Sequence, residues 1–205
     1  PDTVLPIVES MEALDRLVQA GKVRYVGTSN ENAYGLTKAN TVCEYEGLAK
    51  FQSIQNNFSL INPRFLDELA NVCRKEQVSL LPYSPIGGGV LSGKYNGDEV
   101  PRNTRFGDYL HDDNPRQKAM ADRFVNDATI AATAKYLDIA RQAEMSPVTL
   151  ATAWSMNFDF VASTIIGART AEQLEAPLAA LDIKLSDEVM QQCAAVQKEI
   201  LYPMG

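Results

Sequence analysis

Four short segments rich in β-branched and aromatic residues alternate with stretches whose apolar residues have helical spacing. These candidate strands are 22–28, 51–56, 78–83 and 161–166. Strands that alternate with helices in this way form a parallel sheet, because each parallel connection must cross back over the sheet. The sequence therefore predicts an α/β fold built on parallel strands.

Helices are expected between and after these strands, and several carry end signals, such as Gly21 at a C-cap and Ser146 before Pro147 at an N-cap. The predicted helices are 7–20, 33–48, 64–77, 114–126, 129–143, 147–157, one that begins at 169 and one that begins at 186. Between 87 and 113 the chain is rich in Gly, Pro, Asn and Asp. This composition predicts a long loop, and loops of that length are usually functional.

Polar or glycine-rich segments follow each predicted strand, and ligands of parallel α/β folds bind at the carboxyl ends of the strands. The four ends read GTSN, IQNN, PYSPIGGG and IIGART. Together they offer amide groups, an aromatic ring, bare backbone N–H groups and an arginine. This set suits an amide-bearing ring, a pyrophosphate and a phosphorylated ribose. The spacing is neither that of the G-x-G-x-x-G dinucleotide motif nor that of a P-loop.

Each of these segments also has a plainer interpretation when it is taken alone. Ser29 and Asn30 could cap the helix that follows them, and Gly87–Gly89 could form a flexible turn. Arg169 could be a solvent-exposed arginine at the start of a helix. The binding-site hypothesis therefore depends on the four ends meeting around one ligand.

The charge balance excludes some partners. The 205 residues carry a formal net charge of −7, which argues against nucleic acid or an anionic membrane as a partner. No apolar run approaches the roughly 20 residues that span a bilayer. Cys43, Cys73 and Cys193 match neither a disulfide framework nor a zinc pattern, and buried thiols in a reducing compartment are expected. The cytoplasm, or the stroma of an organelle, is the expected location.

Four stretches in this order resemble the C-terminal half of the aldo-keto reductase family: EALDRLVQAGKVRYVGTSN, IQNNFSLI, LLPYSPIGGGVLSGKY and STIIGARTAEQL. The closest similarity is to bacterial, plant and algal oxidoreductases that also resemble the β subunits of voltage-gated potassium channels. The resemblance covers essentially the whole chain. It implies a (β/α)8 barrel that binds NADP(H) in an extended form across the carboxyl ends of its strands.

The resemblance also implies roles for individual residues. Some would hydrogen-bond the nicotinamide carboxamide, one would stack on its ring, and others would wrap the pyrophosphate, clasp the cofactor or read the adenosine 2′-phosphate and ribose. In that order these are Ser29, Asn30 and Gln55; Tyr83; Ser84, Ile86, Gly88 and Lys94; Arg105; and Gly167, Arg169 and Gln173. An arginine at the last position favours NADP over NAD, because it neutralises the extra phosphate. Ala176 and Pro177 stand where many members have a Glu-Asn pair that binds adenine, so weaker adenine recognition is expected.

The family's catalytic Asp, Tyr, Lys and His come from its first four strands, and the chain resembles only the part that follows them. We therefore expect a partial domain over 1–205 that lacks the first four strands and contains no catalytic residue and no metal site. His111 is expected in a surface loop, Tyr25 in the core, and Tyr34 and Tyr45 on a helix. Four strands cannot close an eight-stranded barrel, so the N-terminal half or a second copy would have to complete it.

The function implied is the NADP(H)-dependent reduction of aldehydes or ketones to alcohols by hydride transfer. The partner of the site would be a small carbonyl compound. A different class of function also fits the resemblance: a nucleotide-binding regulatory module without turnover, as in the channel β subunits. The chain itself would supply most of the cofactor site.

Overall fold

The computed structural model describes residues 6–204 and contains a parallel three-stranded sheet in the order β1-β2-β3. The strands are β1 (Val26–Ser29), β2 (Phe51–Gln55) and β3 (Ser79–Leu80). Ser29 is in register with Gln55 and Ile54 with Leu80, so the carboxyl ends of the strands lie along one edge. The predicted parallel α/β sheet is confirmed for these three strands.

The fourth predicted strand, 161–166, is an extended segment with one bridge to β3 rather than a regular strand. The Leu80 N–H donates to the Phe160 carbonyl at 2.7 Å, and the Ile165 N–H donates to the Pro82 carbonyl at 2.8 Å. Pro82 has no N–H with which to continue the ladder. Pro82 therefore limits the pairing of β3 with the segment 161–166. The strand predicted at 78–83 is only two residues long, although Leu81 and Tyr83 still donate to the Ile54 and Asn56 carbonyls.

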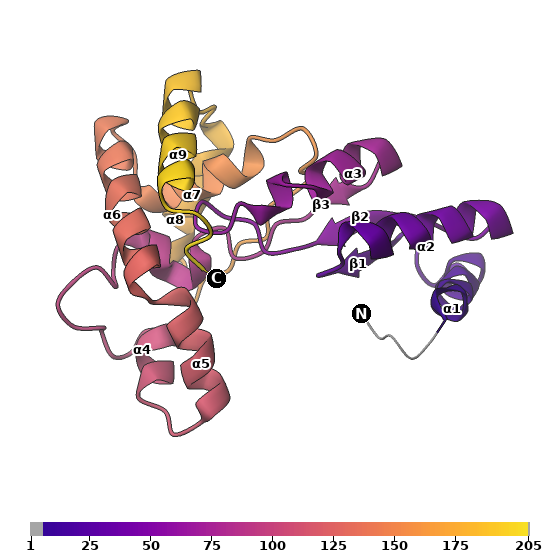
Figure 1. Ribbon diagram of the computed structural model, residues 1–205, viewed down its shortest axis with the longest axis horizontal. Coiled ribbons are helices and arrows are strands. Elements are labelled where there is room, and N and C mark those ends of the chain that lie inside the picture. Colours follow the sequence, from indigo (N-terminus) through magenta and orange to yellow (C-terminus); the bar gives the residue numbers. More distant parts are fainter. Residues whose placement is uncertain (1–5, 205) are drawn as a thin grey trace.

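The part of the chain that the structure describes contains nine α-helices. They are α1 (Ile7–Gln19), α2 (Ala33–Glu46), α3 (Leu69–Glu76), α4 (Arg105–Leu110), α5 (Pro115–Phe124), α6 (Asp127–Gln142), α7 (Pro147–Met156), α8 (Glu172–Ala179) and α9 (Asp187–Glu199). Figure 1 shows α1, α2 and α3 beside the strands, α6 to α9 gathered at the other end, and α4 and α5 as a projecting pair. The predicted N-cap at Ser146 is confirmed, because its side chain accepts from the Val148 N–H.

Two further predicted elements also differ from the structure. The helix predicted at 64–77 is interrupted: a 3₁₀ turn, η1 (Arg64–Leu66), precedes α3, because Glu68 has a φ of −142°, outside the helical range. The long loop predicted at 87–113 is also wrong in part. It contains η2 (Gly87–Ser92) and α4, because Val90, Leu91 and Phe106 bury their side chains and order the segment.

The core between the sheet and α7 is built on aromatic side chains. The Trp154 ring on α7 lies 4.7 Å from the Phe58 ring and 5.1 Å from the Phe158 ring, measured between centroids. Phe160 stacks on Phe158 at 5.3 Å. Aromatic rings bury large apolar areas, so this cluster fixes α7 and the fourth extended segment against the strands. It thereby positions the strand ends relative to one another.

The three cysteines are buried and none forms a disulfide, as predicted. Burial raises the pKa of the Cys73 thiol to about 11 and that of Cys193 to about 12. It also raises the pKa of Cys43, with a smaller contribution from the nearby Asp15 carboxylate. A raised pKa leaves little thiolate at neutral pH, so these are packing residues and not nucleophiles.

Tyr25 is not in the core, where the sequence predicted it, but is 77% exposed. It directly precedes β1, which is an outer strand of the sheet in the described part of the chain. Nothing in residues 6–204 covers that edge, so an apolar side chain there stays in contact with water. Tyr34 and Tyr45 lie exposed on α2, in agreement with the prediction that they are helical.

Candidate functional site

The carboxyl ends of β1 and β2 and the segment after β3 meet in a hydrogen-bonded cluster. The Tyr83 hydroxyl donates to Asn30 Oδ1 at 2.8 Å, and Asn30 Nδ2 donates to Ser29 Oγ at 3.2 Å. Ser29 Oγ and the Asn30 N–H both donate to the main-chain carbonyl of Gln55, each at 3.0 Å. The parallel register thus brings together the four residues predicted for the nicotinamide end. We call Ser29, Asn30, Gln55 and Tyr83 the strand-end cluster.

Two predicted site residues adopt the left-handed backbone conformation. The φ of Asn30 is +54° and that of Ser84 is +56°. This region is uncommon for residues other than glycine, and such outliers gather at functional sites. Asn tolerates it better than most residues, because its short polar side chain bonds locally. Asn30 directly follows β1, and Ser84 directly follows Tyr83, so both positions adjoin the strand-end cluster.

An open cavity of about 490 Å³ lies beside the strand-end cluster. Its lining residues come from the strand ends, from η1, from α3 and from α5. They are Asn30, Asn56, Asn57, Asn62, Arg64, Phe65, Leu69, Tyr83 and Arg123. We call it the strand-end cavity. Cavities of roughly 300–1,000 Å³ are the size that binds small molecules.

The glycines after Tyr83 are required by packing inside the protein. Gly87 and Gly88 have positive φ, and a Cβ at Gly88 would lie 2.6 Å from the Phe106 ring, while one at Gly87 would lie 2.6 Å from Ile61. Both neighbouring side chains are fully buried. These glycines therefore do not form the flexible turn that was one interpretation of the sequence. Their missing side chains also have a structural cause independent of any ligand.

The other residues predicted for the pyrophosphate lie along the same segment. Lys94 is exposed, and its Nζ lies close to Gly89. A Cβ built on Gly89 would come within 2.7 Å of that nitrogen. Ile86 precedes η2 and packs against the main core. Arg105 is the first residue of α4, and its guanidinium lies over the rings of Phe106 and Tyr109 at 5.5 and 5.9 Å. Two cationic side chains thus flank the glycine segment.

The residues predicted for the adenosine end form a third group at the start of α8. Gln173 Oε1 accepts from the Arg169 N–H at 2.9 Å, and Arg169 Nη2 donates to the Asn103 carbonyl at 3.3 Å. Asn103 lies two residues before Arg105, so this bond joins the third group to the α4 segment. A Cβ at Gly167 would meet nothing within 4 Å, so open space faces that position.

The start of α8 already carries a carboxylate. The pKa of Glu172 is lowered, first because its own backbone N–H donates to the carboxylate and second because the Thr170 side chain does. Negative charge is favoured at a helix N-terminus. A phosphate in this region would therefore have to be neutralised by Arg169 and not by the helix end.

The two residues that replace the expected adenine-binding pair face the protein. Pro177 is buried inside α8, and the Ala176 carbonyl accepts a hydrogen bond from Thr149 Oγ1 at 2.8 Å. Neither residue offers a polar side chain to a purine. Weaker adenine recognition stays a prediction that the geometry permits.

His111 follows the last residue of α4, is exposed in a turn, and donates from Nδ1 to the Gly107 carbonyl at 2.7 Å. Its surface position outside the regular helix agrees with the prediction. Within residues 6–204 no group of three or more His, Cys, Asp and Glu side chains is placed to hold a metal ion. The helices of that range are also too short or too polar to span a membrane.

Sequence reasoning missed several residues of the cavity. Asn62, Arg64 and Arg123 line it, although none stands at the end of a predicted strand. Asn62 Nδ2 donates to Asn57 Oδ1 at 3.1 Å, which holds these two lining residues together. Arg123 comes from the last turn of α5, more than 30 residues after the glycine segment, and no local pattern announces its position.

Comparison with known proteins gives a family match. The model of the "Aldo/keto reductase family" matches residues 1–198. Protein tas of Escherichia coli is 36% identical over 200 residues, which are 96% of this chain and 54% of that protein. A putative aryl-alcohol dehydrogenase of Schizosaccharomyces pombe is 31% identical over 183 residues, 88% of this chain and 48% of its own length. An aldo-keto reductase of Fusarium vanettenii is 31% identical over 191 residues, 91% and 48% of the two chains. The chain spans about half the length of the curated relatives it matches.

Proposed function

Because the chain belongs to the aldo/keto reductase family, we propose that it supplies most of the NADP(H) site of an oxidoreductase that reduces aldehydes or ketones to alcohols. The observation that carries this proposal is the strand-end cluster, in which Ser29, Asn30 and Tyr83 form one hydrogen-bonded chain. The carboxamide of nicotinamide has an oxygen that accepts and an NH2 group that donates. A protein therefore binds it with one donor and one acceptor that lie side by side. The hydroxyl of Ser29 and the amide of Asn30 offer both.

In this proposal the chain orients the nicotinamide ring and neutralises the phosphates of the cofactor. NADPH, when bound, would supply the hydride that adds to the carbonyl carbon. Tyr83 would present its ring face to the nicotinamide, and the amide of Asn30 would fix which side of that ring meets the substrate. Lys94 and Arg105 would neutralise the pyrophosphate, and Arg169 the 2′-phosphate, which favours NADP over NAD. The hydrogen bond from Arg169 to the Asn103 carbonyl joins the adenosine group to the segment that carries Arg105.

We further propose that the chain is the C-terminal half of a (β/α)8 barrel. Two features of the sheet support this. Val23 and Tyr25 are exposed beside the outer edge of β1. At the opposite edge a cavity of about 210 Å³ lies between the segment 161–166 and α8, where Leu178 and Leu181 are 46% and 66% exposed. Unpaired edges and exposed leucines of this kind are usually covered by partner strands and helices.

The missing partner would also bring the catalytic groups. In the proposed half barrel, an N-terminal half would supply Asp, Tyr, Lys and His, and its tyrosine would donate a proton to the carbonyl oxygen as hydride arrives. No residue of 6–204 takes that role in our proposal. Residues 1–205 alone would therefore bind cofactor without turning it over.

Reductase activity tests this proposal. We expect no NADPH-dependent reduction of 4-nitrobenzaldehyde by residues 1–205 alone, followed as loss of NADPH absorbance. The same chain extended by the sequence encoded upstream of Pro1 should consume NADPH. An extended protein that binds NADPH but reduces none of a panel of aldehydes and ketones would favour the regulatory module. An upstream sequence without Asp, Tyr, Lys and His at its strand ends would contradict the proposed reductase activity.

Removal of one hydroxyl tests the strand-end cluster. Tyr83→Phe keeps the ring but loses the hydrogen bond to Asn30 Oδ1, so Asn30 is no longer held. We expect the Kd for NADPH to rise by about 3- to 10-fold, the effect of one hydrogen bond. Fluorescence titration measures it.

The matched control for that variant is Tyr34→Phe, which removes a hydroxyl that accepts from Lys38 Nζ on the exposed face of α2. It should leave the Kd unchanged. Equal effects of the two variants would contradict the role given to Tyr83.

A further inference from the structure

The strand-end cavity carries positive charge that nothing in its wall balances. Of its nine lining residues two are arginines, Arg64 and Arg123, and none is Asp or Glu. The chain as a whole has the opposite balance, with 26 acidic and 19 basic residues. An anionic protein that places two arginines and no carboxylate around one cavity has a local field that attracts anions.

Neither arginine is engaged in an ion pair within residues 6–204. The three ion pairs of that range involve Arg74, Lys135 and Arg141. The guanidinium of Arg64 lies over the Tyr202 ring at 4.6 Å, and the nearby Asp67 carboxylate accepts a hydrogen bond from the Tyr202 hydroxyl at 2.9 Å. This contact holds the guanidinium near the ring, and within residues 6–204 its N–H groups form no side-chain hydrogen bond or ion pair, so they remain for a ligand.

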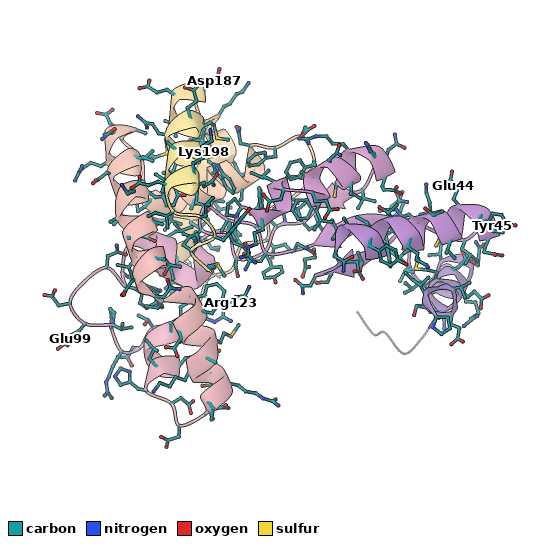
Figure 2. The ribbon with its side chains drawn as sticks, in the orientation of Figure 1. Glu44, Tyr45, Glu99, Arg123, Asp187 and Lys198 are labelled. Atoms are coloured by element: carbon teal, nitrogen blue, oxygen red, sulfur yellow. The ribbon has the colours of Figure 1, made fainter. Side chains whose placement is uncertain are left out.

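Arg123 reaches the same cavity from a different element. Figure 2 shows it at the end of α5 that lies toward the body of the molecule. The next residue, Phe124, is buried and stacks on Phe106 at 4.8 Å, which fixes the backbone that carries Arg123. The two cations therefore approach the cavity from η1 and from α5. Two guanidinium groups from separate elements are well suited to hold one carboxylate or phosphate between them.

The remaining wall of the cavity shows where such an anion would lie. Asn30 and Tyr83, assigned above to the nicotinamide end, form part of it, and Phe65 and Leu69 give it an apolar side. Asn56 also lines the cavity, and its Nδ2 donates to the Glu31 carbonyl at 3.3 Å, which holds the side chain in place. A molecule in this cavity would touch both the nicotinamide cluster and the arginines.

We propose that the strand-end cavity selects carbonyl substrates that carry an anionic group, a carboxylate or a phosphate, which Arg64 and Arg123 hold. This rests on the proposed function, since it assigns the cavity to the substrate of that reaction. The anionic group takes no part in the bond changes. Its binding to the arginines sets where the carbonyl carbon of the same substrate lies. That carbon would then lie against the nicotinamide ring that stacks on Tyr83.

A matched pair of aldehydes tests the selection. 4-Carboxybenzaldehyde and 4-formylbenzamide share their shape and differ in charge. In the protein with its catalytic half, we expect kcat/KM to favour the carboxylate by at least about tenfold, the worth of one charge-assisted hydrogen bond. Arg123→Gln and Arg64→Gln should each reduce this ratio by about tenfold. Glyceraldehyde 3-phosphate against glyceraldehyde gives the phosphate arm, and a preference there alone would identify a phosphate.

Arg116→Gln is the matched control, because Arg116 is exposed in the first turn of the same helix and does not line the cavity. It should leave the ratio within about twofold. Binding gives a second readout without turnover. Calorimetry with NADP⁺ present should show 4-(hydroxymethyl)benzoate binding about tenfold more weakly to Arg123→Gln than to the Arg116→Gln control.

Two results would overturn the proposal. One is a wild-type protein with no preference within either aldehyde pair. The other is an Arg123→Gln variant that binds NADPH itself more weakly while the substrate ratio is unchanged, which would assign Arg123 to the cofactor. Titration of NADPH without substrate separates these results from failure of the proposed function, because only the latter abolishes cofactor binding in the wild-type protein.

Discussion

Arg169→Ala is expected to raise the Kd for NADPH by about 10- to 100-fold and to leave the Kd for NADH nearly unchanged. A hydrogen bond to a charged group contributes about 1.5–3 kcal/mol, and an arginine can make two to one phosphate. NADH lacks the 2′-phosphate and so has little to lose. The Arg169 guanidinium already donates to the Asn103 carbonyl, which holds it near the α4 segment before any ligand arrives.

The ratio of the two affinities is the sharper measurement. It cancels any general loosening of the site, because both dinucleotides share the nicotinamide and the pyrophosphate. Arg141→Ala, an exposed arginine paired with Asp138 on α6, is a suitable control and should leave the ratio unchanged. An Arg169→Ala protein with an unchanged NADPH-to-NADH ratio would show that this arginine does not read the 2′-phosphate.

Gly88→Ala is expected to lower the free energy of unfolding by about 2–4 kcal/mol. The φ of Gly88 is +63°, which costs an alanine about 1–2 kcal/mol. The new Cβ would also lie 2.6 Å from the Phe106 ring. That ring is fully buried and stacked on Phe124, so it cannot swing aside, and overpacking of this kind costs about 1–3 kcal/mol. Urea denaturation should show a midpoint lower by roughly 1–2 M.

Gly167→Ala separates stability from binding. A Cβ there meets nothing within 4 Å and φ is outside the left-handed region, so we expect unfolding to change by less than about 1 kcal/mol. The open space beside Gly167 is assigned to the ribose, so NADPH affinity should fall instead. If Gly88→Ala unfolds at the wild-type urea concentration, the packing explanation of the glycine segment is wrong.

The sequence was sufficient to place the strand-end cluster. Strand and helix alternation predicts a parallel sheet, and a parallel sheet brings the residues after each strand to one edge. Ser29, Asn30, Gln55 and Tyr83 therefore meet as expected, although they span more than 50 positions. The family resemblance added their roles, and those roles stay proposals.

Other features depend on tertiary packing and could not be predicted from local patterns. Pro82 offers no N–H to the segment 161–166, so that segment does not become a regular strand, although its apolar residues predict one. The glycine and proline content of 87–113 is typical of a loop, yet the buried Phe106 orders α4 within it. Tyr25 has the composition of a core residue and is exposed because it lies at an open edge.

The cavity arginines show the same limit. Arg64 follows the second strand by nine residues and Arg123 belongs to a helix far along the chain, and only the folded arrangement brings both to one cavity. An acidic overall charge predicted nothing about this local positive field. Electrostatics of a site depends on which few side chains face it, whereas the net charge describes the whole surface.

Fluorescence titration of the protein with NADPH tests whether the strand-end cluster and the start of α8 belong to one cofactor site. We expect one saturable site that binds NADPH more tightly than NADH and that is weakened both by Tyr83→Phe and by Arg169→Ala. Weaker NADPH binding in both variants would show that Tyr83 and Arg169 contact the same extended ligand. A wild-type protein that shows no saturable change with NADPH would contradict the proposed cofactor site.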